Sequence, residues 1–449
     1  MSSRIKYLTA AAALAVTTSS FAGEGAATFQ ADFLAGKLSW QNVVQEAQKE
    51  GAVQFYYWGG SDELNVWIDS VAVPALAELG VKLVPNRITG TKDAVDLVLA
   101  EAASGRGIGE GSVDAIWLNG ENFYTLSRQT MLFGSFAQVL PNADNFEWDP
   151  ADQRSQLNFR DFGVETGSQE IPWSGEQYVC AVNRALVSTD ETLKTFDDLK
   201  AYLEANPGKF TYVKPPNYVG NTFVQEVVYS FNPDGTGSAP FQKSLEDLGV
   251  DELARLAAPG FEYLRSIEPQ LLGAASGNVR YPEDAAASRG LFANGETHIH
   301  CEFGLFAVAT NRANGSYPET AEEVVFPAGN MIKNKNYLAI VANAPNPAAA
   351  LVFANYMASV DAQASKLEVI GYPAGIDPWK LSATDAQRLV EAAPPHFGVT
   401  QDELDANIAP DTNASLVDVI EATWLEFIER KATKPLAEIM ASAAADLAR

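Results

Sequence analysis

Aromatic, acidic and amide side chains gather in a few short segments of this sequence, and this mixture is suited to holding a small molecule. The candidate ligand-binding residues are Trp58, Gly59, Asp62, Trp117, Asn119, Glu121, Asn122, Trp173, Glu176, Asn217 and Tyr218. Rings beside carboxylates favour a cation, because an ammonium group gains about 0.5 to 2 kcal/mol over a ring face and charge-assisted hydrogen bonds from the acid. We therefore expect a cationic or zwitterionic organic ligand.

Each of these side chains also has a simpler interpretation. A tryptophan at the end of a strand often packs in the core, and this applies to Trp58, Trp117 and Trp173. Asp62 and Glu121 follow glycine turns, where solvated acids are common. Both interpretations stay open at the level of sequence.

Alternating strands and helices would position these segments. Strand-like runs and helical periodicity alternate at 53–58, 64–79, 81–84, 93–103 and 113–118. This alternation predicts a mainly parallel α/β sheet, whose ligand crevice lies beyond the carboxyl ends of the strands. The segments 58–62 and 119–123 follow two of these strands, so we expect their side chains to face that crevice.

A second unit begins near Trp173. Residues 212–223 predict a strand, a proline-rich loop and a helix capped by Asn221 or Thr222. Further strands are predicted at 177–182, 297–302, 324–326 and 337–341, and the chain after 347 is mostly helical. No internal repeat is visible.

Composition excludes several classes of protein. The chain has 449 residues, of which 47% are hydrophobic and 20% charged, enough for two large lobes. Its 31 basic and 57 acidic residues give a net charge of −26, which would repel nucleic acid and anionic lipid. Residues 1–22 have the basic start, apolar stretch and small-x-small ending of a cleavable signal peptide. We expect export to the periplasm and a soluble mature protein that binds no nucleic acid.

Two other kinds of chemistry remain as alternatives. His298, His300 and Glu302 share one face of a predicted strand and could ligate a metal ion, but the sequence shows no further ligands nearby. Ser174 could be drawn as the nucleophile of a secreted hydrolase, although the GxSxG elbow is absent. We expect no enzymatic activity, no metal and no cofactor.

Five segments carry a resemblance to a known family. They are WGGSDELNVWID, EAASGRGIGEGSVDAIWLNGENF, IPWSGEQYVCAVNR, FTYVKPPNYVGNTF and NYLAIVANAPNPAAALVFANYM. In this order they resemble the extracellular solute-binding protein family 1 of bacterial ABC importers, in particular the YnjB-type substrate-binding proteins. The resemblance covers nearly all of the chain after residue 22.

The resemblance implies an α/β, two-lobed periplasmic binding protein type II fold with a hinge and an interlobe ligand cleft. Lobe 1 would comprise residues 40–172 and 299–342, and lobe 2 residues 173–298 and 343–449. The implied partners are a small-molecule ligand and the permease and ATPase subunits of an ABC importer, and we expect a monomer. Polyamines, thiamine-like compounds and amino acids all remain candidate ligands.

Cys180 and Cys301 are the only cysteines. In the layout that the resemblance implies, their strands run side by side, and an oxidising periplasm would permit a disulfide. Alternatively, they are small buried residues that face opposite sides of the sheet.

Overall fold

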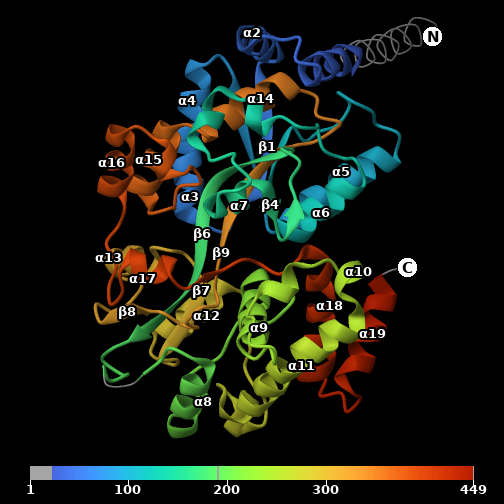
Figure 1. The fold of residues 1–449 in the computed structure, drawn as a ribbon. Helices are drawn as coiled ribbons and strands as arrows, with labels where there is room; N and C mark the ends of the chain where they lie inside the picture. The colour runs from blue at the N-terminus through green and yellow to red at the C-terminus, as the bar shows by residue number, and fades with distance from the viewer. Residues whose placement is uncertain (1–22, 190–191, 448–449) are drawn as a thin grey trace, which may run out of the picture.

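Two long strands, β6 (Glu170–Asn183) and β9 (Met331–Ile340), run antiparallel through the middle of the molecule and connect its two lobes (Figure 1). This computed structural model describes residues 23–189 and 192–447, so the predicted signal peptide at 1–22 lies outside the described residues. The register of the two strands shifts between Pro172 and Ser174, which places an irregularity at Trp173.

The central sheet has the strand order β2-β1-β3-β9-β6-β7. Strand β1 (Ala52–Trp58) is parallel to β2 (Lys82–Ile88) and to β3 (Ala115–Leu118), which confirms the predicted parallel sheet for this part of the chain. Strand β9 then pairs antiparallel with β3, and β6 antiparallel with β9. The carboxyl ends of β1 and β3 therefore point toward the second lobe.

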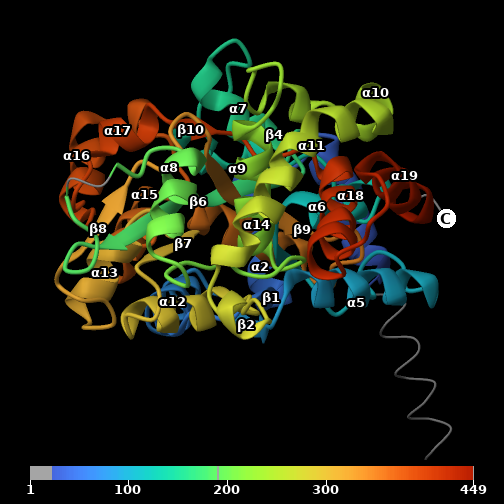
Figure 2. The same ribbon diagram turned by 90° about the horizontal axis from the view of Figure 1, so that it is seen from below.

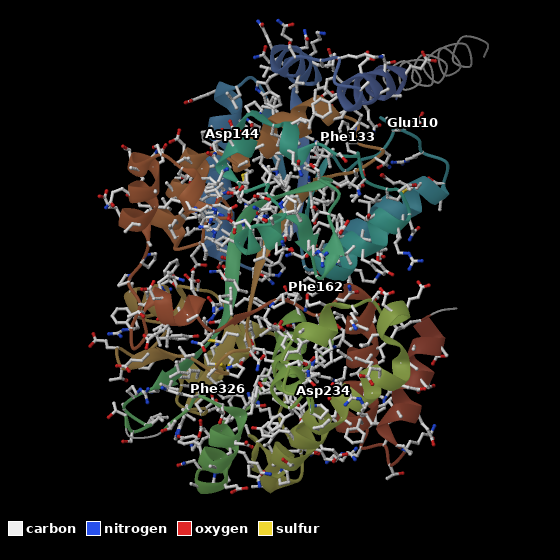
Figure 3. The ribbon with its side chains drawn as sticks, in the orientation of Figure 1. Glu110, Phe133, Asp144, Phe162, Asp234 and Phe326 are labelled. Carbon is white, nitrogen blue, oxygen red and sulfur yellow. A yellow bond between two sulfur atoms is a disulfide. The ribbon has the colours of Figure 1, made fainter. Side chains whose placement is uncertain are left out.

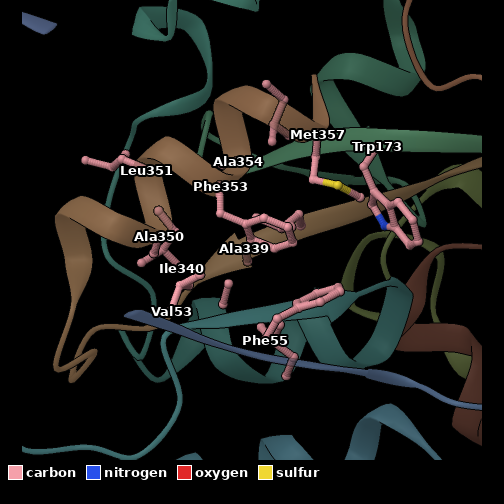
Figure 4. Packing of buried hydrophobic residues seen from close by; sticks show 14 of the residues in the cluster. Val53, Phe55, Trp173, Ala339, Ile340, Ala350, Leu351, Phe353, Ala354 and Met357 are labelled. Atoms are coloured by element: carbon pink, nitrogen blue, oxygen red, sulfur yellow. The ribbon is translucent and has the colours of Figure 1, made fainter. Parts of the chain in front are cut away.

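Lobe 1 packs helices on both sides of the β2-β1-β3 sheet. Its elements are α2 (Trp40–Glu50), α3 (Asp62–Trp67), a π-helical turn (Ile68–Ala72), α4 (Val73–Glu78), α5 (Thr91–Ala103), α6 (Gly120–Arg128), α7 (Gln156–Phe159), the hairpin β4 (Arg160–Asp161) and β5 (Val164–Glu165), α14 (Pro347–Met357), α15 (Val360–Ile370) and α16 (Ala383–Ala392). Fully buried Phe55, Trp173 and Phe353 pack together in its core (Figure 4). Residues 23–34 form a further helix on this lobe.

Lobe 2 is built around the outer half of β6. Its elements are α8 (Phe196–Ala205), α9 (Tyr218–Ser230), α10 (Leu245–Leu248), α11 (Val250–Ile267), α12 (Ala285–Ala293), β7 (Ile299–Phe303), α13 (Ala307–Ala313), β8 (Ala321–Val324), α17 (Gln401–Asp405), β10 (Ile408–Ala409), α18 (Ala414–Trp424) and α19 (Leu436–Leu447). Helices α18 and α19 pack side by side at one edge of this lobe (Figures 1 and 2). No helix within residues 23–189 and 192–447 is both long enough and apolar enough to cross a membrane.

The two hydrophobic cores divide the chain differently from the expected lobe boundaries of 40–172 with 299–342 and 173–298 with 343–449. Strand β7 pairs with the outer half of β6 and packs in the core of lobe 2, because its partner residues are 178–182. Helices α14 and α15 pack in the core of lobe 1, since the apolar α14 lies against α2 and β1. The part of the chain that the structure describes thus crosses between the lobes three times, in β6, in β9 and between α16 and α17.

Cys180 and Cys301 are directly opposite each other in the β6–β7 pair and form a disulfide. Both cysteines belong to the core of lobe 2. The first of the two alternatives from the sequence is therefore the one that the structure contains.

Replacing both cysteines by alanine is expected to lower the free energy of unfolding by about 4 to 5 kcal/mol, because the bond closes a long loop in the unfolded chain. Denaturant unfolding of the non-reduced wild type and the variant measures this. A reductant should destabilise the wild type and leave the variant unchanged. Two reactive thiols per chain in unfolded, non-reduced protein would contradict the bond.

Candidate functional site

A row of aromatic rings runs from the surface of lobe 1 to the crossing strands. The ring of Trp58 meets that of Trp117 edge-on at 6.1 Å between centroids, and Trp117 meets Trp173 at 5.0 Å. The row ends at Tyr372, whose ring stacks on Trp173 at 6.0 Å. Trp58 is 39% exposed, Trp117 8% and Trp173 fully buried. The sequence-predicted tryptophans are thus brought together, but only Trp58 offers a broad free surface.

Two glycines hold Trp58 in this position. A Cβ atom on Gly60 would lie 2.3 Å from the Trp58 ring, so the ring can fold over this residue only because it is glycine. The Gly59 amide donates to the Ile88 carbonyl at 3.0 Å and fixes the end of the strand. Asp62 begins α3 and is exposed beside this turn.

Lys366 lies against the ring faces of Trp173 and Tyr372, at the buried end of the aromatic row. Lys366 Nζ lies 4.9 Å from the centre of the Trp173 ring and 5.1 Å from that of Tyr372. It donates to the carbonyl oxygens of Trp173 at 2.6 Å and Pro373 at 3.1 Å. Burial lowers the pKa of Lys366, and the nearby Glu176 carboxyl opposes this. The inner end of the row is therefore packed like a core.

A chain of amides links lobe 1 to both crossing strands. Trp117 Nε1 donates to Asn119 Oδ1 at 2.7 Å, and Asn119 Nδ2 donates to Asn336 Oδ1 at 3.1 Å and to the Lys335 carbonyl at 3.0 Å. Asn336 Nδ2 donates to Ser174 Oγ at 2.8 Å. The loop after β3 is thus hydrogen-bonded to β9 and β6, where the lobes join.

The beginning of α6 carries the acidic part of the predicted site. Gly120 has φ +56°, and its amide donates to Asp161 Oδ2 at 2.6 Å. Asn122 Nδ2 donates to Glu121 Oε1 at 3.2 Å. Burial, together with the Asp418 carboxyl, raises the pKa of Glu121 to about 7 against backbone hydrogen bonding that lowers it.

Lobe 2 contributes the first turn of α9. Asn217 caps this helix by accepting from the Val219 amide at 3.0 Å, so the helix begins at Tyr218 and the predicted cap at Asn221 or Thr222 is wrong. Tyr218 accepts from Asn334 Nδ2 at 2.6 Å.

The Tyr218 ring lies in an aromatic enclosure with contributions from both lobes. It stacks on Phe303 of lobe 2 at 5.0 Å and meets Phe162 of lobe 1 at 5.8 Å. Phe162, labelled in Figure 3, lies where the lobes meet, and its carbonyl accepts from the Ala414 amide of lobe 2 at 2.9 Å.

Glu176 lies on β6 just after the strand irregularity, and its hydrogen bond is not to α6 or α9. Its Oε2 accepts from the Leu305 amide at 3.1 Å. Burial raises its pKa to about 7, while the Leu305 amide and the Lys366 charge lower it. It therefore joins the inner end of the aromatic row rather than the acidic end.

Sequence reasoning missed four buried polar residues at the junction of the lobes, Asp161, Glu170, Asn334 and Asp411. Burial raises the pKa of Asp411 to about 8, with Asn334 hydrogen bonding opposing and Glu121 adding to the rise. The pKa values of Asp161 and Glu170 are also raised by burial. Asp411 lies in lobe 2 between β10 and α18, and no local sequence motif marks this position.

The alternative chemistries find little support in these contacts. His298 Nδ1 bonds to the Tyr202 hydroxyl at 2.7 Å and His300 Nδ1 to Ser288 Oγ at 3.0 Å, so they have different partners. Glu302 lies 2.7 Å from Arg289 and 3.2 Å from His300 Nε2, so two of the three candidate ligands are in contact and His298 is not one of them. Within the part of the chain that the structure describes, no three histidine, cysteine or acidic residues are grouped closely enough to hold a metal ion.

The two-lobed α/β fold is that of periplasmic solute-binding proteins, and comparison with known proteins shows the family. The chain belongs to the bacterial extracellular solute-binding protein family, whose model matches residues 73–393. Protein YnjB of Escherichia coli (strain K12) is 32% identical over 389 residues, covering 86% of this chain and 93% of that protein.

Solved structures share the fold at low identity. An ABC transporter solute-binding protein from Thermotoga lettingae TMO, bound with α-D-tagatose, has a TM-score of 0.63 and 14% identity over 88% of this chain and 98% of that one. The spermidine/putrescine ABC transporter substrate-binding protein PotD from Streptococcus pneumoniae has a TM-score of 0.53 and 12% identity over 87% and 98%. The resemblance seen in the sequence is thereby confirmed.

The exposures of the tryptophans predict different effects of mutation. Trp173→Ala is expected to cost about 3 to 5 kcal/mol of unfolding free energy, because it empties a fully buried position. Trp58→Ala is expected to change stability little, since the ring is 39% exposed, yet to weaken ligand binding. Denaturant unfolding and ligand titration of both variants measure this. Unchanged ligand affinity in Trp58→Ala would remove this residue from the site.

The buried acids predict that the ligand-free protein loses stability as pH rises. Asp411 and Glu121 have ordinary pKa values of 3.8 and 4.5 and folded values of about 8 and about 7. Their contribution is fully present below the ordinary values and is lost as pH rises through 7 and 8. Thermal unfolding midpoints at pH 5.5 and 8.5 should therefore differ less in Asp411→Asn than in wild type. The exposed Asp402→Asn is the control, and equal pH dependence in both variants would contradict this assignment.

Proposed function

We propose that this protein is the receptor of an ABC importer that captures a small cationic or zwitterionic organic molecule between its lobes. The observation that carries the proposal is the meeting of aromatic rings and acids at the lobe junction. Tyr218, Phe162 and Phe303 lie there beside Asp161 and Asp411. Such a combination of ring faces and carboxyls is what a small organic cation requires.

The two-lobed architecture supports capture by closure. Among residues 23–189 and 192–447, only β6, β9 and the segment between α16 and α17 join the lobes, so the remaining contacts between the lobes can open and close. The Phe162 carbonyl and the Ala414 amide form one of these contacts. The closed form would then be the form presented to the permease and its ATPase.

Binding without turnover is the activity that these groups support. Ser174 Oγ accepts from Asn336, and within the described residues no histidine is hydrogen-bonded to it. A secreted hydrolase and a metal-ion carrier of the same fold are therefore the less favoured candidates. Membership of an extracellular family, with the predicted leader at 1–22, supports a periplasmic location.

Purification from the periplasm without refolding, followed by mass spectrometry, is expected to identify a co-purified organic cation or zwitterion. Adding that compound back to stripped protein should reduce the radius of gyration in small-angle scattering. At 100 times its dissociation constant it should also stabilise the fold by about 2.7 kcal/mol. Amines, thiamine-like compounds, amino acids, sugars and anions form the comparison panel. An unchanged radius with every compound would refute capture by closure.

A further inference from the structure

The structure points to the kind of cationic group that the site receives. We propose that Asp411, Glu121 and Asn334 bind an ammonium group that carries N–H bonds, so that the ligand is a primary amine rather than a quaternary amine or a neutral sugar. This inference rests on the proposed function and adds the recognising residues and the substrate class.

Acceptor atoms without donors carry the inference. Asp411 Oδ1 and Asn334 Oδ1 are buried and have no hydrogen-bond partner among the described residues. Their side chains are 3% and 4% exposed, and the Asn334 amide is hydrogen-bonded to Tyr218 and interacts with Asp411. A buried acceptor left without a donor costs about 1 to 3 kcal/mol. Two neighbouring acceptor atoms of this kind are complementary to a group with several N–H donors.

The local charge selects a cation. Within residues 23–189 and 192–447, neither Asp411 nor Glu121 forms an ion pair with a lysine, arginine or histidine. Glu121 lies close enough to Asp411 to disfavour its ionisation, and Asp161 is a third acid that senses both of these carboxyls. An alkylammonium group would supply both the missing positive charge and the missing donors.

The spacing of the acids disfavours a bare metal ion, because no described group of three acidic or histidine ligands is close enough to coordinate one. The aromatic neighbours instead suit an organic chain. Tyr218 stacks on Phe303 and contacts Phe162, so apolar surface adjoins the acceptors. Glu121 and Phe162 belong to lobe 1 and Asp411 to lobe 2, so the recognition site is complete only when the lobes meet.

A quaternary ammonium group satisfies the charge but donates no hydrogen bond, and a sugar donates hydrogen bonds but brings no charge. This difference defines the test. Primary mono-, di- and triamines, beginning with 1,4-diaminobutane, are titrated into stripped protein beside their trimethylammonium analogues and D-tagatose. We expect at least one primary amine to bind, and its trimethylammonium analogue and the sugar to bind at least tenfold more weakly.

Variants locate the interaction. Asp411→Asn and Asn334→Leu should each weaken binding of the primary amine at least tenfold in calorimetry, while the exposed Asp402→Asn on α17 should leave it unchanged. Asp411→Asn keeps the shape of the protonated carboxyl, and circular dichroism with the thermal midpoint verifies that it folds.

Two results would overturn the inference. The first is equal affinity of wild type and Asp411→Asn for the primary amine, and the second is the absence of binding by any primary amine at 10 mM. If a neutral or quaternary compound compacts the protein instead, capture by lobe closure stands and only this inference fails. If no compound compacts it, the proposed function fails as well.

Discussion

The pairing of β6 with β9 is the constraint on which the rest of the molecule depends. One antiparallel pair continues from lobe 1 into lobe 2, so both cores are built on the same sheet. At the register shift beside Trp173, α15 secures the strand, since Gln363 Nε2 donates to the Trp173 carbonyl at 2.6 Å and Lys366 donates to the same oxygen. The position of lobe 1 on the strands is thereby fixed, and the loops after β1 and β3 are directed at lobe 2.

The junction of the lobes concentrates polar groups that an ordinary core would exclude. Burial raises the pKa of Asp161 and Asp411 there, neighbouring carboxyls add to the rise, and acceptors lack donors, although burying such groups is unfavourable. A region of this kind is poorly optimised for the stability of the isolated protein. It is better suited to a state in which another molecule supplies the missing charge and hydrogen bonds. Functional sites commonly contain such locally unfavourable structure.

Local sequence rules predicted the parts of the fold that depend on neighbouring residues. Strands and helices in the first 120 residues follow from apolar periodicity, and the loops after them face the junction because parallel strands end at one edge. The acids at 161 and 411 could not be found in this way, because pairing of distant segments brings them together. The lobe boundaries failed for the same reason: strand-like and helical patterns at 299–303 and 347–357 do not say against which half of the crossing strands each element packs.

The disulfide between Cys180 and Cys301 joins two neighbouring strands of a single lobe. A covalent link inside one rigid body restricts the unfolded chain but leaves the angle between the bodies untouched. The bond therefore adds resistance to unfolding without placing a covalent link between the two lobes. The disulfide at Cys180 thus lies within the core of lobe 2, whereas the part of β6 that joins the two cores lies between Trp173 in lobe 1 and Tyr178 in lobe 2.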